Sequence, residues 1–340
     1  MLLKPARWVL LTWVRHRPNS SLFRNTTSGP SNSDKGSSEY SSTKETHFGF
    51  ETVSEQEKSE KVRAVFENVA KNYDLMNDCM SLGVHRVWKD IFVHRLDPTS
   101  SMKLIDVAGG TGDIAFRFLK YKKQKRDFTK TVFPFDFPLQ TLPNNPRPEN
   151  EVEAQYQAME EFPTGSTDLR SEDRSVLVCD INPKMLDVGR NRAKTALTPT
   201  EQQRIDWMEG DAENLDKIPD NSFDAYTIAY GIRNCVHVDK VLTEAYRVLK
   251  PGGRFMCLEF SRVNNPLLKW VYDQYSFQAI PALGQVIAGD YDSYKYLVES
   301  IRKFPSQEDF KALIEAVGFR FVTFENLTFG VSSIHSGFKL

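Results

Sequence analysis

Short apolar runs alternate with amphipathic helical segments over most of the chain. Runs of strand length occur at residues 103–107, 175–179, 205–209, 225–229, 254–260, 320–326 and 332–338. Helical patterns separate several of these runs, at 114–121, 183–194, 239–249 and 306–317. Strands that alternate with helices predict an α/β fold with a mostly parallel seven-stranded sheet, covered by helices on both faces. A short turn joins the last two strands, so we expect an antiparallel hairpin at one edge of the sheet.

Other segments depart from this alternation. Residues 1–50 are polar and rich in serine, which predicts a presequence followed by a disordered linker. Residues 51–102 have a helical period and predict a helical cap ahead of the main domain, 103–340. Within that domain, residues 122–174 carry a basic run, prolines and acids, and we expect a surface insertion. Residues 264–300 are rich in aromatic and apolar side chains, which fits a lid over a site or a surface facing a membrane or another subunit.

The N-terminal composition indicates a mitochondrial transit peptide. The first 33 residues contain no Asp or Glu but carry Lys4, Arg7, Arg15, Arg17 and Arg24. Acid-poor sequence with arginine and serine is typical of mitochondrial import signals. A secretory signal is the alternative, but its apolar run is short and is closed by two arginines. No stretch of the sequence approaches the roughly 20 apolar residues of a spanning helix, so we expect a soluble or peripheral mature protein.

Charge and cysteine usage exclude several classes of protein. The 340-residue chain has 44 basic and 45 acidic residues, and this balance gives no electrostatic case for nucleic acid as the main partner. The four cysteines are scattered without a CxxC pair, and the six histidines without an HExxH motif. We therefore expect neither a disulfide framework nor a metal site.

A glycine-rich turn, DVAGGTGD at 106–113, lies between a predicted strand and a predicted helix. Gly110, Thr111 and Gly112 let backbone N–H groups approach a ligand closely. The match to the dinucleotide fingerprint GxGxxG is poor, because no third glycine follows at the required place. Asp106, at the strand end, would repel a diphosphate and suits a ligand with a cationic amino group. Taken alone, the motif also fits a turn that binds nothing.

Two further acids end the next two predicted strands. Asp180 lies where a carboxylate can accept both ribose hydroxyls, and Asp211 with the Ala212 amide lies where an adenine edge could be bound. Each acid alone has a structural alternative, since Asp180 could cap the helix that begins near Pro183. Together, three carboxylates at the carboxyl ends of three consecutive strands face the crevice in which open sheets bind ligands.

The order of these motifs resembles a class I S-adenosylmethionine (SAM)-dependent methyltransferase, with a Rossmann-like fold. Residues 73–88 (YDLMNDCMSLGVHRVW) and 247–261 (RVLKPGGRFMCLEFS) are similar to the two signatures of the ubiquinone/menaquinone C-methyltransferase family. The resemblance covers about residues 55–340, apart from the insertion, and implies SAM as cofactor. Carried over by position, the cofactor contacts are Thr111, Asp180, Asp211 and Ala212, with the 109–112 loop around the methionine part. Ala229 stands where bacterial relatives have a serine contact.

The resemblance implies C-methylation of a polyprenyl benzoquinol in ubiquinone synthesis. This reaction needs an electron-rich ring carbon held close to the sulfonium methyl. We assign Arg233 to stabilising a developing phenolate and Asn234 to orienting it, with a structural ion pair as the alternative for Arg233. Tyr73 and His85 could cap the substrate, and His85 is a candidate base, although a packing or capping role is its alternative. The residue that takes the proton stays open.

Expected partners are the polyprenyl benzoquinol, other enzymes of a coenzyme Q biosynthetic complex, and the matrix face of the mitochondrial inner membrane as a peripheral contact. A homodimer is a further expectation. An NAD-dependent oxidoreductase is the first alternative function, because it shares the strand, glycine turn and acid arrangement. A non-catalytic scaffold of a quinone biosynthetic complex is the second.

Overall fold

The computed structural model describes residues 44–69, 73–132 and 175–340, and for residues 69, 73–76 and 126–132 the backbone alone. Predictions for residues 1–43, and for most of the expected insertion at 122–174, lie outside the described residues. Residues 122–132 belong to helix α4 (Asp113–Val132), which continues well beyond the helix expected at 114–121. The basic run there consists largely of Lys, Arg and Gln, which are good helix formers, so the expected insertion does not begin as a loop.

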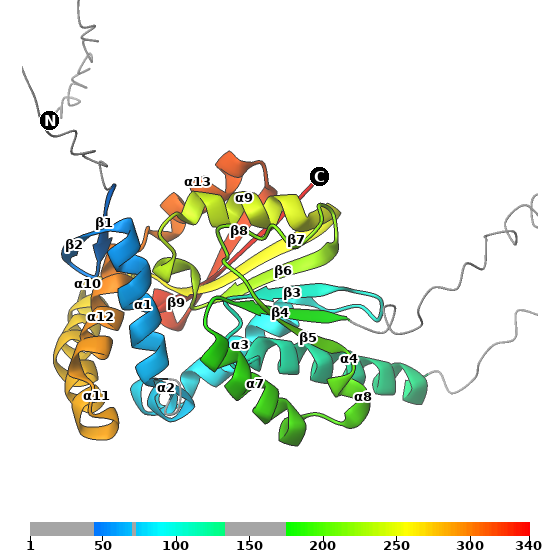
Figure 1. Ribbon diagram of the computed structural model, residues 1–340, viewed down its shortest axis with the longest axis horizontal. Coiled ribbons are helices and arrows are strands. Elements are labelled where there is room, and N and C mark those ends of the chain that lie inside the picture. Colours follow the sequence, from blue (N-terminus) through cyan, green and yellow to red (C-terminus); the bar gives the residue numbers. More distant parts are fainter. Residues whose placement is uncertain (1–43, 70–72, 133–174) are drawn as a thin grey trace, which may run out of the picture. The chain divides into compact units, whose positions relative to one another are not determined.

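A seven-stranded sheet forms the centre of the fold (Figure 1). Its strand order is β5-β4-β3-β6-β7-β9-β8. Strands β3 to β7 run parallel to one another, and β9 runs antiparallel to both β7 and β8. The strands are β3 (Leu104–Val107), β4 (Val176–Asp180), β5 (Ile205–Glu209), β6 (Phe223–Ala229), β7 (Leu249–Phe260), β8 (Arg320–Leu327) and β9 (Ser332–Phe338). The predicted α/β class and the antiparallel edge are confirmed, with β9 inserted between β7 and β8.

Helices cover both faces of this sheet, as Figure 1 shows. One apolar core lies between the sheet and α3, α4 and α7, and includes Phe92, Phe118 and Leu186. The other lies under α9 and α13, and includes Leu242 and Phe310. The helices are α3 (Val84–Leu96), α7 (Pro183–Ala196), α8 (Pro199–Gln202), α9 (Val238–Val248) and α13 (Gln307–Val317), with short 3₁₀ turns η1 (Ile232–Asn234) and η3 (Thr328–Gly330).

A hairpin precedes the first helix, where the sequence predicted a linker. Strands β1 (Glu45–Phe48) and β2 (Glu51–Ser54) pair in antiparallel fashion, so the linker prediction is wrong for residues 45–50. The hairpin packs on distant residues: the Phe48 ring stacks on Tyr296 with centroids 4.0 Å apart, and the Phe50 N–H donates to Glu299. The composition of residues 45–50 does not reveal contacts with residues near the other end of the chain.

Replacing Phe48 with alanine is expected to lower the free energy of unfolding by at least about 1 kcal/mol, because stacked aromatic pairs are worth about 0.5–1.5 kcal/mol beyond the area they bury. Urea denaturation at matched protein concentration measures this change. Phe50→Ala is a matched control, since Phe50 is more exposed and its ring lies 6.3 Å from that of Phe277. If the Phe48 variant were as stable as the parent, the packing of Phe48 on Tyr296 would not stabilise the fold.

A layer of helices lies beside the carboxyl ends of the parallel strands, on the left in Figure 1. It combines α1 (Glu55–Val69) and α2 (Tyr73–Ser81) with α10 (Pro266–Gln274), the π-helical turn η2 (Tyr275–Ala279), α11 (Ile280–Ala288) and α12 (Tyr291–Lys303). The Tyr275 hydroxyl joins the two groups by donating to the Met80 carbonyl at 2.8 Å. The segments predicted as a helical cap and as a lid therefore pack against each other.

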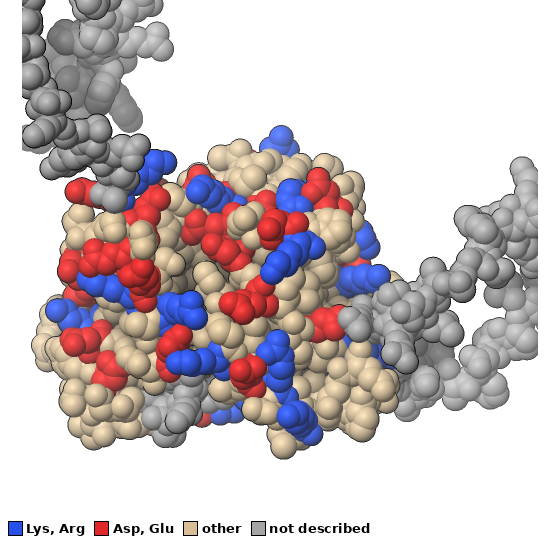
Figure 2. All heavy atoms as spheres, in the orientation of Figure 1, with Lys and Arg blue, Asp and Glu red and all other residues tan. Residues whose placement is uncertain are grey.

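The surface carries charges of both signs. On the face in Figure 2, acidic and basic side chains are interspersed over the described elements. This mixture agrees with the formal net charge of −1. Among the helices described, none is long and apolar enough to cross a membrane.

Candidate functional site

Two adjoining cavities lie where β3, β4, β5 and β6 end. The polar cavity, of about 490 Å³, is lined by the glycine-rich turn and by the acids that follow the strands. The apolar cavity, of about 290 Å³, is lined mainly by aromatic and aliphatic side chains of the helical layer. The two cavities share four lining residues, namely Phe66, Lys89, Tyr230 and Asn234. A ligand in one cavity can therefore meet a ligand in the other.

Asp106 is fully buried on β3 and lines the polar cavity. Its Oδ1 accepts a hydrogen bond from the Thr227 hydroxyl at 2.8 Å, whereas its Oδ2 has no hydrogen-bond partner within the described part of the chain. Burial raises the pKa of the Asp106 carboxyl to about 7, against the opposing effect of that hydrogen bond. A buried acceptor without a partner is costly, and a cationic N–H donor from a ligand would satisfy it.

Asp180 ends β4 and lines the same cavity. Its Oδ2 accepts from the Gly110 N–H at 2.8 Å and its Oδ1 from the Asn182 N–H at 2.9 Å. Burial raises the pKa of its carboxyl to about 6. The helix cap that was the alternative role for Asp180 is provided by Asn182, whose side chain accepts from the Lys184 and Met185 N–H groups. Asp180 thus keeps acceptor capacity for a ligand.

Asp211 and Ala212 follow β5 and complete this side of the polar cavity. Asp211 is exposed, and its Oδ1 accepts from the Glu213 N–H at 2.9 Å. The three acids that the sequence singled out therefore line one cavity. Ala229 lines it as well and carries no hydroxyl to donate there.

Some residues of the glycine-rich turn line the polar cavity, and others pack on the core. Gly110 and Thr111 line the polar cavity, and the Thr111 hydroxyl accepts from Arg192 at 2.6 Å. Gly112 does not line either cavity: its φ is +78°, and a Cβ there would lie 2.7 Å from the Trp207 ring. The structure thus places Gly112 away from the predicted ligand contact, where its small size allows the turn to pack on the core.

Arg233 lines the apolar cavity and is also one half of a buried ion pair. Its Nη1 lies 2.8 Å from Glu259 Oε1 and donates to the Tyr230 carbonyl at 2.6 Å. The side chains of Arg233 and Glu259 are 6% and 1% exposed, and the guanidinium lies over the Phe260 ring. The structural alternative for Arg233 is therefore confirmed, and it coexists with a position in the cavity wall.

The other candidate catalytic residues lie around the junction of the cavities. Asn234 lines both, and its Oδ1 accepts from the Tyr296 hydroxyl at 3.1 Å. His85 lines the apolar cavity with Nδ1 2.7 Å from the Ser81 hydroxyl; burial, with the charge of Lys89, lowers its pKa to about 4. The imidazole is thus neutral near pH 7. Tyr73 begins α2, and its side chain lies outside the described residues.

Lys89 is a site residue that the sequence analysis missed, and Tyr230 belongs to the predicted segment 230–234 but had no role assigned to it. Both are buried and line both cavities. Lys89 follows His85 by four positions, so the two share one face of α3, and a lysine on the buried face of a helix was the available signal. Tyr230 has a positive φ of 58°, and its hydroxyl lies 3.2 Å from that of Ser332. No local sequence pattern marks it.

Comparison with known proteins identifies close relatives. Residues 54–339 match the model of the ubiE/COQ5 methyltransferase family. Three similar proteins carry the name 2-methoxy-6-polyprenyl-1,4-benzoquinol methylase, mitochondrial. The Drosophila melanogaster protein is 54% identical over 300 residues, covering 87% of this chain and 86% of its own. The Bos taurus and Homo sapiens proteins are each 55% identical over 302 residues, with coverage of 87% of this chain and of 84% and 85% of their own.

Proposed function

Because the chain belongs to the ubiE/COQ5 methyltransferase family, we propose that it methylates a ring carbon of 2-methoxy-6-polyprenyl-1,4-benzoquinol in ubiquinone synthesis. It is a SAM-dependent methyltransferase, and the names of its relatives support this substrate. The observation that carries the proposal is the junction of two cavities of different character, with carboxylates lining one and aromatic walls in the other.

The residues of the polar cavity fit SAM. We assign Asp180 to the ribose hydroxyls, Asp211 and the Ala212 amide to the adenine, and Asp106 to the ammonium group of the methionine part. Asp106 supports this fit directly, since its buried Oδ2 has no hydrogen-bond partner among the described residues. When bound, SAM supplies an electrophilic methyl group on a sulfonium.

The residues of the apolar cavity suit an aromatic ring with hydroxyl groups. Tyr230 and Asn234 lie at the junction and can orient the ring toward the polar cavity. Arg233 offers a fixed positive group to a developing phenolate, which makes the ring carbon more nucleophilic. The neutral His85 imidazole can exchange a hydrogen bond with a quinol hydroxyl while Ser81 holds its other nitrogen. Alignment of ring and methyl in a near-attack geometry contributes most to the rate.

SAM affinity is expected to rise with pH up to about 8, because Asp106 must be ionised to hold an ammonium group. The pKa of Asp106, about 7 when buried, means that binding below that pH must displace a proton. We expect Kd to rise by up to about tenfold for each pH unit below the pKa. Isothermal titration calorimetry of wild-type protein and Asp106→Asn tests this, with a flatter profile expected for the variant. Parallel profiles would contradict the role of Asp106.

The Asp106 carboxyl has the opposite pH dependence in folding: it stabilises the folded protein at low pH. Its pKa is raised on folding, so the folded protein binds the proton more tightly than the unfolded chain does. The stabilisation is therefore complete at low pH and is lost as pH rises from about 4 to about 7.

The proposed activity is tested by methyl transfer from SAM to a short-tailed 2-methoxy-6-alkyl-1,4-benzoquinol, with the product located by NMR. We expect the methyl group on a ring carbon. Transfer to oxygen alone would contradict the assignment. A titration with SAM and with NAD separates the methyltransferase from the oxidoreductase alternative, since we expect heat of binding with SAM only.

We also propose that the protein acts at the matrix face of the mitochondrial inner membrane. The acid-free N-terminal sequence and the relatives named mitochondrial support this location. Helix α10 exposes Leu267 (71%) and Trp270 (63%), while neighbouring Tyr272 and Tyr275 line the apolar cavity. A polyprenyl chain could thus pass from lipid to the cavity beside α10. Contacts with other coenzyme Q enzymes and a homodimer stay predictions.

A further inference from the structure

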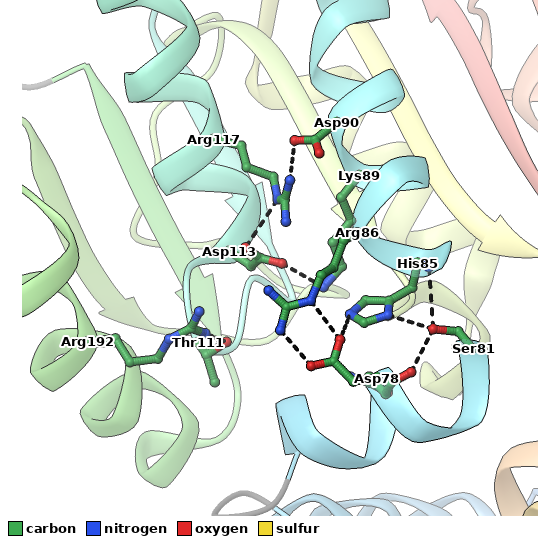
Figure 3. A network of polar contacts seen from close by, with 11 residues as sticks. Asp78, Ser81, His85, Arg86, Lys89, Asp90, Thr111, Asp113, Arg117 and Arg192 are labelled. Carbon is green, nitrogen blue, oxygen red and sulfur yellow. Dashed lines mark hydrogen bonds and ion pairs between the residues drawn. The ribbon is translucent and has the colours of Figure 1, made fainter. Parts of the chain in front are cut away.

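Lys89 is a buried lysine at the junction of the two cavities, with no role assigned above. Its residue is 7% exposed, although lysine is almost never buried unless it is paired. Its Nζ lies 2.8 Å from Asp113 Oδ2, so the pair joins α3 to the first turn of α4 (Figure 3). Asp113 does not depend on Lys89 alone, because Arg117 Nε donates to its Oδ1 at 3.2 Å.

The charges around the start of α4 favour an anionic ligand group. Lys89, Arg117 and Arg192 approach it with three positive charges, against the carboxylates of Asp113 and Asp90 (Figure 3). The N-terminal end of a helix adds partial positive charge. Of these side chains, Lys89 and Asp113 line the polar cavity itself, so a lysine ammonium group is available to a ligand at this end.

The acids of the polar cavity define a direction across the sheet. Asp106 lies on β3, Asp180 ends β4 and Asp211 follows β5, and these three strands are consecutive in the sheet. A nucleoside with an amino-acid chain, lying across these three acids, places its chain at the β3 end, beside the turn that leads to Asp113. There Asp106 complements an ammonium group, and Lys89, which also lines the cavity, has the charge that complements a carboxylate.

Other cations on the polar cavity are less suited to this task. Within the described part of the chain, the remaining Lys and Arg residues lining it are Arg63 and Lys240. Arg63 has a side chain that is 56% exposed and pairs with Glu67, and Lys240 is exposed. Interactions of exposed ion pairs are weak, whereas a charge-assisted hydrogen bond in a buried site is strong.

We propose that Lys89 binds the carboxylate of the methionine part of SAM, and that it thereby couples α3 to cofactor binding. This inference depends on the proposed assignment of the polar cavity to SAM. Asp113 holds the ammonium group of Lys89 in place, as a positioning residue. Lys89 also lines the apolar cavity, so the residue that binds the cofactor carboxylate also borders the cavity assigned to the substrate ring.

Calorimetric binding of three ligands to Lys89→Met tests the proposal without relying on turnover. S-adenosylhomocysteine carries ammonium and carboxylate, S-adenosyl-3-thiopropylamine lacks the carboxylate, and 5′-methylthioadenosine lacks both. We expect the variant to bind the first roughly 10- to 100-fold more weakly, the loss of one charged hydrogen bond. For the other two ligands, the Kd of the variant should be within about twofold of the wild-type Kd.

The remaining outcomes are distinct. An equal loss for all three ligands would show that Lys89 only holds the fold, and unchanged binding of S-adenosylhomocysteine would also overturn the proposal. Lys125→Met is the matched control, because Lys125 pairs with Asp97 at 2.7 Å on the surface with 45% of its side chain exposed. Lys89→Arg should restore part of the selectivity for the carboxylate. Failure of wild-type protein to bind any of the ligands would refute the assignment of the cavity to SAM instead.

Discussion

Replacing Asp180 with alanine is expected to weaken SAM binding by roughly 10²- to 10⁴-fold, because two hydrogen bonds to a charged acceptor are each worth about 1.5–3 kcal/mol. The carboxylate is held by the Gly110 and Asn182 N–H groups, so it reaches the ligand already oriented. Calorimetry with S-adenosylhomocysteine measures the loss directly, and methyl transfer at fixed SAM should fall in parallel.

A control is needed because Asp180 also ties the glycine turn to β4. Asp180→Asn keeps the shape and one of the two acceptor oxygens but loses the charge, and its affinity for the ligand should fall between those of the alanine variant and wild type. Asp187→Ala on α7 is the surface control, since Asp187 pairs with Arg190 and its side chain is 68% exposed. A thermal melting point for Asp180→Ala close to that of wild type, together with lost binding, assigns the effect to the ligand. Affinity within about tenfold of wild type in that variant would contradict the site.

The parallel sheet could be predicted because its strands are short, apolar and separated by turn signals. Strands β5 and β9 coincide with the predicted ranges 205–209 and 332–338. The three acids could be predicted for the same reason, since residues that follow parallel strands meet at one edge. Their arrangement depends on the order of strands along the chain and little on side-chain packing.

Features that depend on packing between distant segments could not be predicted in this way. The β1–β2 hairpin forms because Phe48 stacks on Tyr296, and Lys89 is buried because Asp113 receives it. Residues 45–50 follow a long polar segment, and neither they nor Lys89 reveal these distant partners when taken alone. The packing of Gly112 could not be predicted for a related reason: a glycine in a ligand-binding turn can also pack on the core, and at Gly112 a Cβ would meet the Trp207 ring. The composition of residues 106–113 predicts a turn, but contacts with distant residues determine whether each of them faces the polar cavity or the core.

Replacing Glu259 with alanine is expected to lower the free energy of unfolding by about 3–5 kcal/mol, because it leaves the charge of Arg233 buried without its partner. Both side chains are almost fully enclosed, so water cannot replace the lost carboxylate. Burial raises the pKa of Glu259 while Arg233 lowers it, and the 2.8 Å contact supports an ionised pair. Urea denaturation of the single variants measures the cost.

The double variant Glu259→Leu with Arg233→Met separates stability from catalysis. A buried pair replaced by apolar residues of similar size is often neutral or stabilising, so the double variant should recover most of the stability that Glu259→Ala loses. Its methyl transfer should stay low, because no cation then faces the developing phenolate, while binding of S-adenosylhomocysteine should be close to wild type. Recovery of both stability and activity would show that Arg233 is structural alone. Recovery of stability without activity would place the guanidinium in the reaction, with Glu259 as the residue that allows a buried positive charge to exist beside an aromatic cavity.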